Sequence, residues 1–380
     1  MNVSKGGRYE KKKATKQKKP LGWKKITLIV LAVILVVIVA LVIAGVIYYN
    51  SLLNMVNRPG EVSVPTMSDE ELNAMLGTLP PETTVETAEE TTEETTEPDP
   101  TWASDTNFTN IMLVGQAARV GEDYRLSDTM MLCTINRETN TVTLTSFLRD
   151  MRVRIPAYAG KGQGFNRMNV CYHLGSYYTG EVTGSMEMLA LAVEQNFGVP
   201  VDYTIEVDFE MFEKVVDVLG GVDVELTEAE LKYLKVNYPW DFGDDMVVGM
   251  NHLYGYQALC YARIRKIDSD WVRTSRQRNL LNILLDKCRT LDVTTLHRLL
   301  TEVLPLITTD MTNDEITSLA MEMIPMIKNI QFASQQVPFD GTWWSTNAGT
   351  EEVPEYVIDC DLNKNKQLLL ESLGMVEASE

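Results

Sequence analysis

The fold is decided by residues 197–226, which read FGVPVDYTIEVDFEMFEKVVDVLGGVDVEL. The segment VDYTIEVD, residues 201–208, predicts a strand. Over the next segment, 208–219, apolar side chains recur at helical spacing: Phe209, Phe212, Val215, Val216 and Leu219. Two glycines at 220 and 221 end this helix, and VDVEL predicts a second strand. A strand–helix–strand order is typical of an α/β protein.

The same alternation continues in both directions along the chain. Before this stretch, apolar runs predict strands at 109–115, 129–135 and 141–147, and helical spacing predicts a helix at 183–197. After it, we expect helices at 227–234, 252–262, 271–289, 294–306 and 313–327, a strand at 330–338, and a last helix capped by Asp361 and ending at Gly374. The predicted fold class is therefore α/β, with a mixed central sheet covered by helices on both faces.

The N-terminal part predicts a membrane anchor. Residues 26–49, ITLIVLAVILVVIVALVIAGVIYY, are 24 uncharged and mostly apolar positions, enough for one transmembrane helix. Residues 1–25 hold ten Lys or Arg and one acid, Glu10, which places this basic tail in the cytoplasm and everything after Tyr49 outside. A cleaved signal peptide is the alternative, but its apolar stretch is normally about 7–15 residues. We expect a single-pass protein of the cell membrane with an extracytoplasmic C-terminal domain.

A linker with a strong negative charge follows the anchor. Residues 50–106 contain a short juxtamembrane segment and then PPETTVETAEETTEETTEPDP, residues 80–100, which is too polar to bury a core and predicts a spacer that holds the domain off the membrane. Of the 34 Lys and Arg residues, ten precede residue 26 together with one of the 53 acids, so the remainder carries 24 basic and 52 acidic side chains. The net negative charge of the chain after residue 25 repels polyanions and argues against nucleic-acid binding.

Several kinds of chemistry find no support in the sequence. The cysteines are odd in number, lie far apart and form no CxxC pair, so buried small apolar residues are favoured over a disulfide scaffold or metal ligands; they are Cys133, Cys171, Cys260, Cys288 and Cys360. The chain has no HExxH, GxSxG, GxGxxG or GxxxxGK[ST] motif. Zinc hydrolysis, serine hydrolysis and nucleotide binding of the usual types are therefore not indicated.

One stretch of this acidic chain is strongly basic. Between Tyr261 and Arg278 it holds six cations against two acids, Asp268 and Asp270; the cations are Arg263, Arg265, Lys266, Arg273, Arg276 and Arg278. If 261–266 is extended, Arg263 and Arg265 share a face, and if 271 onward is helical, Arg273, Arg276 and Gln277 share another. Guanidinium forks match phosphate oxygens, so the pattern suits a phosphate or pyrophosphate clamp. A salt-bridged, solvated helix surface is the simpler interpretation.

Polar residues also stand at two strand ends. Ser127-Asp128-Thr129 leads into one predicted strand, and Leu148-Arg149-Asp150 ends another. Ligands of open α/β sheets bind at strand ends, although a charge there can be an ordinary surface residue. Asp128 is a candidate Mg²⁺ ligand, with substrate phosphates filling other positions, and Arg149 is a candidate partner of the basic stretch.

Six ordered motifs resemble the LytR-CpsA-Psr family of cell-wall glycopolymer ligases. They are NIMLVG, SDTMMLCTIN, TSFLRD, RMNVCY, the stretch quoted at the outset, and GYQALCYARIRKIDSDWVRTSRQRN, and they cover roughly residues 108–290. The resemblance implies a membrane-anchored α/β enzyme that moves an anionic glycopolymer, teichoic-acid-like or capsular, from a polyprenyl pyrophosphate carrier to peptidoglycan with Mg²⁺. It implies a catalytic domain at 107–290, with the helices, strands and closing helix of 291–380 packed on it, and a Gram-positive type of bacterium.

The resemblance also implies roles for individual residues. Asp128 is expected to bind Mg²⁺, and Asp128, Arg149, Arg263 and Arg265 are expected to be catalytic. The pyrophosphate is expected to bind Arg119, Arg149, Arg263, Arg265, Arg273, Arg276, Gln277 and Asn169. Arg167 takes the place of a lysine that the family usually has. Mg²⁺ and the arginines would together neutralise charge as the phosphate is transferred.

Two departures from the family pattern keep other functions open. Ala117 stands where a second acidic residue is expected, and Leu126 stands where the family tends to have arginine, with Arg125 displaced by one. Glu122 or Asp123 is a candidate replacement for the lost carboxylate. The alternatives are a non-catalytic relative that binds polyprenyl pyrophosphate lipids, and a lipid pyrophosphate hydrolase that uses water as acceptor.

An aromatic segment, GTWWSTN at residues 341–347, is predicted as a turn. Its tryptophans, Trp343 and Trp344, have two interpretations: stacking on a sugar ring, or covering an edge of the core.

Overall fold

The computed structural model describes residues 45, 47–61, 107–116, 127–159, 164–326, 329–347 and 356–375. The chain forms two compact units, Met1–Ser51 and Leu52–Glu380, and the fold below is that of the second. Among the described residues, no helix has the length and apolar character needed to cross a membrane. The predicted anchor at 26–49 and the linker at 80–100 lie almost entirely outside these ranges.

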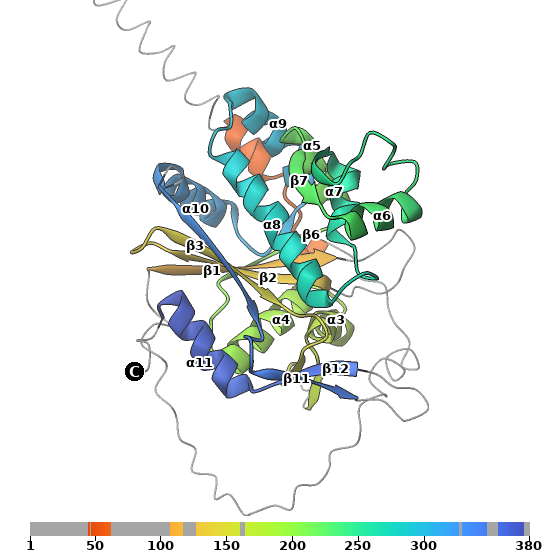
Figure 1. The fold of residues 1–380 in the computed structure, drawn as a ribbon. Helices are drawn as coiled ribbons and strands as arrows, with labels where there is room; N and C mark the ends of the chain where they lie inside the picture. The colour runs from red at the N-terminus through yellow and green to blue at the C-terminus, as the bar shows by residue number, and fades with distance from the viewer. Residues whose placement is uncertain are drawn as a thin grey trace, which may run out of the picture. The chain divides into compact units, whose positions relative to one another are not determined.

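A six-stranded sheet forms the centre of the second unit (Figure 1). Its strand order is β10 (Gln331–Val337), β3 (Thr141–Phe147), β2 (Ser127–Asn136), β1 (Phe108–Gln116), β6 (Tyr203–Val207) and β9 (Thr308–Thr309). β1 pairs with β6, and β3 with β10, in parallel, whereas the β1–β2, β2–β3 and β6–β9 pairs are antiparallel. The predicted mixed sheet is confirmed.

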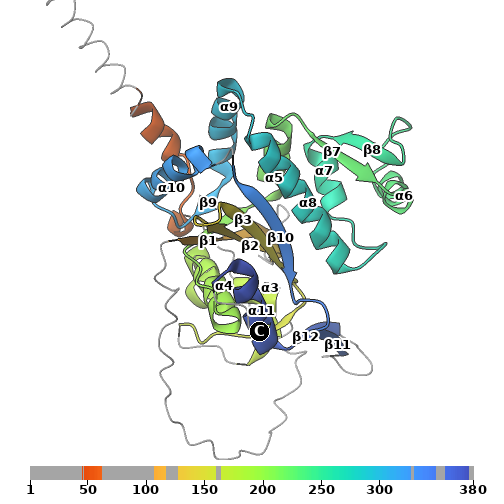
Figure 2. The same ribbon diagram turned by 60° about the vertical axis from the view of Figure 1, so that its left-hand side comes forward.

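Helices cover both faces of this sheet because alternate side chains of each strand point to opposite sides. Met112 and Val114 of β1 pack in one core with α3 (Met168–Thr179), α4 (Val182–Phe197) and α11 (Leu362–Leu373). Ile111 of β1 and Met131 of β2 belong to a core on the other face, against which α8 (Asp270–Cys288) and α10 (Asn313–Met326) pack. Figures 1 and 2 show these two layers of helices.

A further group of elements builds a core of its own on α8. It consists of the hairpin of β7 (Val222–Leu226) and β8 (Gly249–Leu253) with α5 (Phe209–Val218), α6 (Glu228–Asn237), α7 (Gly255–Ala262) and α9 (Val293–Val303). The helices α5 and α7 approach closely at Gly255, where an added Cβ would lie 2.5 Å from the carbonyl oxygen of Glu213. Two small hairpins complete the unit: β4 (Arg152–Arg154) with β5 (Phe165–Arg167), and β11 (Trp343–Asn347) with β12 (Tyr356–Cys360).

Some sequence-based assignments were wrong. The predicted helix at 252–262 begins only at Gly255, because the residues before it pair as β8 with β7. The tryptophans of the predicted turn lie on β11. Residues 261–266 are not extended: α7 ends at Ala262 and a loop follows. The helix α3 and the short strands β4, β5, β9 and β12 were not predicted, since short strands are specified by partners distant in sequence.

The five cysteines are free, and burial raises the pKa of the thiols of Cys133, Cys171 and Cys360 to about 12. A raised pKa keeps a thiol protonated, and only the thiolate is an efficient nucleophile. At pH 8 we expect these thiols in the folded protein to react with Ellman's reagent on the order of 1,000-fold more slowly than in guanidinium chloride. A thiol that reacts at the same rate in the folded protein and in guanidinium chloride would contradict the conclusion that it is buried and unreactive.

Candidate functional site

The predicted site residues meet at one end of the sheet. Because β1, β3, β6 and β10 run in the same direction, their carboxyl ends lie at the same edge, where β2 begins. Asp128 is the second residue of β2, and Arg149 follows the end of β3 by two residues. The hydrogen-bond register places Met130 opposite Phe147, which brings the Asp128 and Arg149 segments side by side. Ligands of α/β sheets bind at this edge.

Arg149 joins two carboxylates. One of its terminal nitrogens donates to Asp128 Oδ1 at 2.7 Å, and its Nε donates to Asp150 Oδ2 at 3.3 Å. Burial lowers the pKa of Arg149, but Asp150 and Asp128 outweigh it, so the net effect is a raised pKa. The Arg149 guanidinium is therefore permanently charged and fixed in orientation at the strand end.

Asp150 is the common partner of three arginines. Besides Arg149, its carboxylate lies 3.8 Å from Arg167 of β5 and 3.8 Å from Arg265 of the α7–α8 loop. Its backbone carbonyl accepts a hydrogen bond of 3.0 Å from the Ile358 amide on β12. Asp150 therefore gathers side chains from three separate parts of the chain.

The first turn of α8 closes the group from another side. Asp270 lies 2.7 Å from Arg273, one turn further along the helix, and 3.8 Å from Arg265. Arg273 is almost fully buried and donates to the backbone carbonyl of Asp128 at 3.1 Å, which ties α8 to the start of β2. Asp128, Arg149, Asp150, Arg167, Arg265, Asp270 and Arg273 are called the arginine cluster below.

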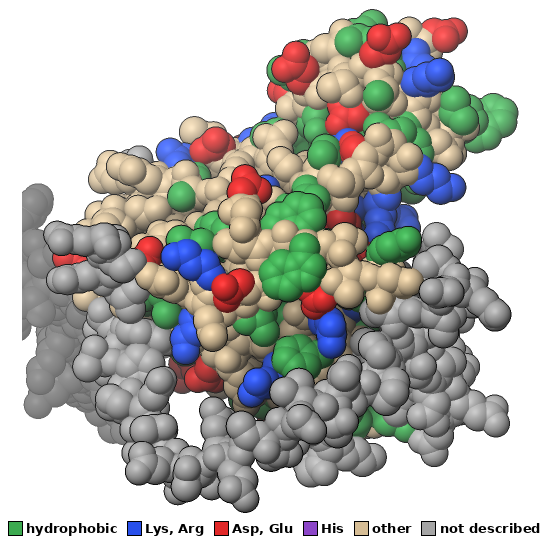
Figure 3. All heavy atoms as spheres, turned by 60° about the horizontal axis from the view of Figure 1, so that its bottom comes forward, with side chains coloured by type: hydrophobic (Ala, Val, Ile, Leu, Met, Phe, Trp, Pro, Cys, Tyr) green, Lys and Arg blue, Asp and Glu red, His purple; other side chains and the backbone are tan. Residues whose placement is uncertain are grey.

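The arginine cluster contains four guanidiniums and three carboxylates, an excess of positive charge in an acidic chain. The pKa of Arg265 is lowered, first by burial and then by repulsion from Arg149 and Arg273. A guanidinium destabilised by two like charges gains from an added anion. In Figure 3, Lys and Arg side chains lie near Asp and Glu side chains at several places on the face shown.

Two predicted polar residues adjoin the cluster. The backbone amide of Asn169 donates to the Arg149 carbonyl at 3.2 Å, and its buried Oδ1 has no hydrogen-bond partner within the described parts of the chain. Gln277 lies one helical turn after Arg273 on the same side of α8, and its Oε1 is likewise buried without such a partner. Buried polar atoms normally have partners, so these two oxygens point to a bound molecule or water.

Two other predicted arginines have different surroundings. Arg263 caps the end of α7, and its guanidinium lies over the ring of Phe209, 4.5 Å from the ring centroid. Arg276 is buried and pairs with Glu230 and Asp268, and it donates to the Ile264 carbonyl. Arg276 follows Arg273 by three residues on α8, but its guanidinium is held by Glu230 and Asp268 and not by a carboxylate of the arginine cluster. Their roles in pyrophosphate binding stay predictions.

Several residues singled out in the sequence lie outside the described ranges: Ala117, Arg119, Glu122, Asp123, Arg125 and Leu126.

The contacts of Trp343 on β11 favour the interpretation that it covers an edge of the core. The ring of Trp343 packs on Trp271 of α8, with centroids 4.7 Å apart, and Trp271 packs against the core beneath α3 and α4. Trp344, the next residue on the strand, points to the opposite face of the hairpin.

A divalent metal would find one carboxylate at the predicted position. Within the described parts of the chain, no group of three or more His, Cys, Asp or Glu side chains is arranged to hold a metal. The Asp128 carboxylate is partly exposed and is shared with Arg149. Mg²⁺ is commonly held by one or two carboxylates together with substrate phosphates. The residues present therefore fit a metal that takes most of its ligands from the substrate.

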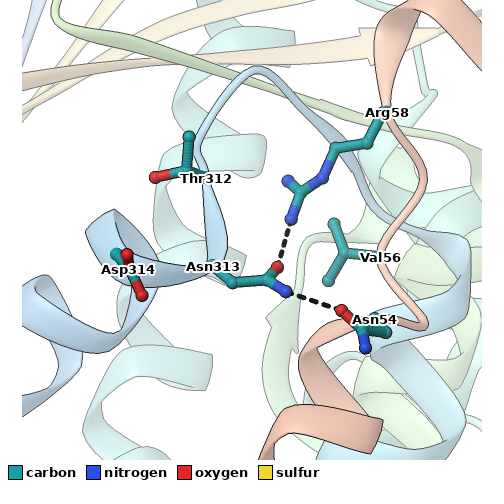
Figure 4. Close-up of a pocket in the computed structure, with 6 residues that line it drawn as sticks. All are labelled: Asn54, Val56, Arg58, Thr312, Asn313 and Asp314. Atoms are coloured by element: carbon teal, nitrogen blue, oxygen red, sulfur yellow. Dashed lines mark hydrogen bonds between the residues drawn. The ribbon is translucent and has the colours of Figure 1, made fainter.

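A cavity of about 390 Å³ lies elsewhere and shares no residue with the arginine cluster (Figure 4). It is lined by Asn54, Val56, Arg58, Thr312, Asn313 and Asp314.

Sequence reasoning missed Asp150 and Asp270 as members of the site. Asp150 directly follows Arg149 at a strand end, a signal that was available in the sequence. Asp270 was noted only as one of two acids in the basic stretch, and its contact with Arg265 depends on the loop between α7 and α8.

The chain is similar to known proteins over most of its length. The model of the LytR_cpsA_psr family matches residues 79–357. A polyisoprenyl-teichoic acid–peptidoglycan teichoic acid transferase TagU of Bacillus anthracis is 30% identical over 235 residues, 61% of this chain and 69% of that protein. The TagT transferase of Bacillus subtilis is 33% identical over 189 residues, 48% of this chain and 53% of that protein. The crystal structure of B. subtilis TagT has the same fold, with a TM-score of 0.53 and 24% identity over 71% of this chain and 92% of that one.

Proposed function

This chain belongs to the LytR-CpsA-Psr family, and we propose that it is a membrane-anchored phosphotransferase of the cell envelope. Its donor is an anionic glycopolymer, teichoic-acid-like or capsular, carried on polyprenyl pyrophosphate, and its acceptor is peptidoglycan. The similarity to TagU and TagT, which are named as polyisoprenyl-teichoic acid–peptidoglycan teichoic acid transferases, supports this assignment.

The observation that carries the proposal is the convergence of Arg149, Arg265 and Arg273 at one end of the sheet. Three guanidiniums, from the segment after β3, the α7–α8 loop and α8, lie in the cluster that also holds Asp128. One arginine guanidinium can bind two phosphate oxygens at the same time. The fold holds these charged groups in position before the substrate binds. Asn169 and Gln277 adjoin the cluster and carry side-chain amide groups.

The transfer forms one bond and breaks one. An acceptor hydroxyl of peptidoglycan bonds through its oxygen to the phosphorus that carries the glycopolymer and loses its proton to solvent, and the bond from that phosphorus to polyprenyl phosphate breaks. Negative charge increases on the departing phosphate, and Arg149, Arg265 and Arg273 are positioned to stabilise it. Asp128 would hold Mg²⁺, which when bound supplies additional neutralisation of the phosphate oxygens. Asp150 and Asp270 position the arginines.

The test uses the full-length protein in detergent with a polyprenyl-pyrophosphate-linked glycopolymer and a peptidoglycan oligomer, in Mg²⁺ or EDTA. We expect mass spectrometry to show the glycopolymer phosphate joined to the oligomer and polyprenyl phosphate released, with turnover at least about 100-fold lower in EDTA.

Other products would overturn the proposal. Free glycopolymer phosphate without a joined product would identify a lipid pyrophosphate hydrolase. Bound but unchanged lipid would identify a non-catalytic relative, and Ala117→Asp should then restore turnover if the missing carboxylate is the cause.

A further inference from the structure

The hairpin of β4 (Arg152–Arg154) and β5 (Phe165–Arg167) has one buried face and one basic face. Its strands read RVR and FNR, and successive side chains of a strand point to opposite faces. Val153 and Asn166, which lie opposite each other, are buried at 0% and 5% exposure. The other four side chains share the outer face, which is called the hairpin face below; they are Arg152, Arg154, Phe165 and Arg167.

The hairpin face presents cations around an aromatic ring. Phe165 is 39% exposed, and Arg154 is exposed as well. The guanidinium carbons of Arg152 and Arg154 lie 5.3 Å and 5.8 Å from the centroid of the Phe165 ring. Both guanidiniums are therefore held beside an aromatic surface that solvent reaches.

The register of the hairpin places two like charges opposite each other. Arg152 pairs directly with Arg167, an arrangement that destabilises a strand pair. Asp359 of β12 lies 3.5 Å from Arg152, and Asp150 lies 3.8 Å from Arg167, but within the described parts of the chain Arg154 has no such ion pair. The face keeps an excess of positive charge at a local cost in stability, which is typical of a binding surface rather than of a structural hairpin.

The backbone of this hairpin is held rigidly. The side-chain oxygen of Asn196 on α4 accepts a hydrogen bond of 2.9 Å from the Arg154 amide, and its side-chain nitrogen donates to the Arg154 carbonyl at 2.8 Å. At one end of the hairpin the Met168 amide donates to the Met151 carbonyl at 2.8 Å. A surface that is fixed in advance loses little conformational entropy when a ligand binds.

The hairpin face is continuous with the arginine cluster. Asp150 accepts from Arg149 Nε and lies 3.8 Å from Arg167, which belongs to both groups. Arg167 in turn opposes Arg152 across the hairpin. Arg152 follows Arg149 by three residues, at most about 11 Å of chain. A series of guanidiniums thus extends from the arginine cluster along the hairpin to its outer residues; in order they are Arg149, Arg167, Arg152 and Arg154.

We propose that the hairpin face binds the anionic glycopolymer chain of the donor beyond its pyrophosphate. Guanidiniums at successive positions suit a chain whose anionic groups repeat, and the exposed Phe165 ring suits the apolar face of a sugar. All polyprenyl pyrophosphate carriers have the same head group, so this face would select donors with a charged glycan over donors with a neutral one. The identity of the chain rests on the proposed function, whereas the binding of a polyanion to the hairpin face does not.

The first test measures transfer by the full-length protein in detergent. It uses two donors on the same prenyl pyrophosphate, one with phosphate-linked repeats and one with uncharged sugars of equal length. We expect Arg152→Gln/Arg154→Gln to lower the ratio of kcat/KM for the charged donor to kcat/KM for the uncharged donor at least about tenfold, through KM of the charged donor. The control is Arg298→Gln, which removes an exposed cation on α9 and should leave this ratio within twofold.

An unchanged ratio in Arg152→Gln/Arg154→Gln would overturn the proposal. A rise in KM for the peptidoglycan oligomer, with KM for the charged donor unchanged, would assign the hairpin face to the acceptor and would equally overturn it.

Calorimetry gives a readout that does not depend on transfer. Lipid-free poly(glycerol phosphate) should bind the unaltered full-length protein, and it should bind Arg152→Gln/Arg154→Gln at least about tenfold more weakly. Arg152→Lys/Arg154→Lys, which keeps both charges, should bind it within about threefold of the unaltered protein. Equal binding by the unaltered protein and the Gln variant would overturn the subsite even if transfer occurs. If the unaltered protein uses neither donor, the proposed function fails, while the calorimetric result still decides the subsite.

Discussion

Replacing Arg265 with alanine is expected to lower kcat/KM for glycopolymer transfer about 100-fold without loss of stability. The Arg265 side chain is 39% exposed, and its ion pairs with Asp150 and Asp270 are long, at 3.8 Å. Its removal therefore leaves no buried charge unpaired. Burial and repulsion from Arg149 and Arg273 lower the pKa of Arg265, which means that its charged form is destabilised in the folded protein. A bound anionic substrate would stabilise that charged form.

Lys266→Ala is the matched control, since Lys266 is the adjacent exposed cation and takes no part in the arginine cluster. It should retain transfer within twofold. Steady-state kinetics and thermal melting would be measured on both variants, together with binding of a polyprenyl pyrophosphate. Equal losses in the two variants would mean that general positive charge, rather than the cluster geometry, attracts the substrate.

Replacing Arg276 with alanine is expected to destabilise the fold by about 3–5 kcal/mol. Arg276 is 4% exposed and joins Glu230 of α6, Asp268 of the preceding loop and the Ile264 carbonyl. Glu230 also caps α6 through Thr227, so one buried carboxylate connects two helices. Removing the guanidinium leaves Glu230 buried with an uncompensated charge.

Denaturant unfolding of Arg276→Ala at several pH values measures this effect. Burial raises the pKa of Glu230, but its bonds to Thr227 and Arg276 outweigh it and the pKa is lowered overall. A lowered folded pKa stabilises the protein above the unfolded value, near 4.3, and that stabilisation is lost as the pH falls through the folded pKa. The difference in the free energy of unfolding between Arg276→Ala and the unaltered protein should therefore become smaller below about pH 4.

Arg298→Ala is the control for Arg276→Ala, because Arg298 forms an exposed pair with Glu302 on α9. Arg298→Ala should lower the free energy of unfolding by less than about 1 kcal/mol. If Arg276→Ala instead kept its stability and lost transfer as strongly as Arg265→Ala, Arg276 would be a pyrophosphate ligand and the structural role would be wrong.

The amino-acid sequence was enough to predict the α/β class, the three long strands β1, β2 and β3, and the strand ends that carry Asp128 and Arg149. Hydrophobic periodicity predicts these features, because it indicates which side chains of a helix or strand face the core. It also identified the region of Arg265 and Arg273, since six cations in one stretch of an acidic chain are visible without any fold.

Which of these cations come together could not be predicted before the folded structure was known. Arg265 and Arg273 join Arg149 through Asp150 and Asp270, whereas Arg276 pairs with Glu230, 46 residues away. The same is true of Arg58, which bonds to Asn313 across 255 residues. Hydrophobic periodicity predicts which face of a helix or strand is buried. A long charged side chain, however, can pair with any oppositely charged or polar group within its reach. An edge strand pairs with its neighbour through backbone hydrogen bonds, which do not depend on residue type. Those choices depend on distances that exist only after the chain has folded.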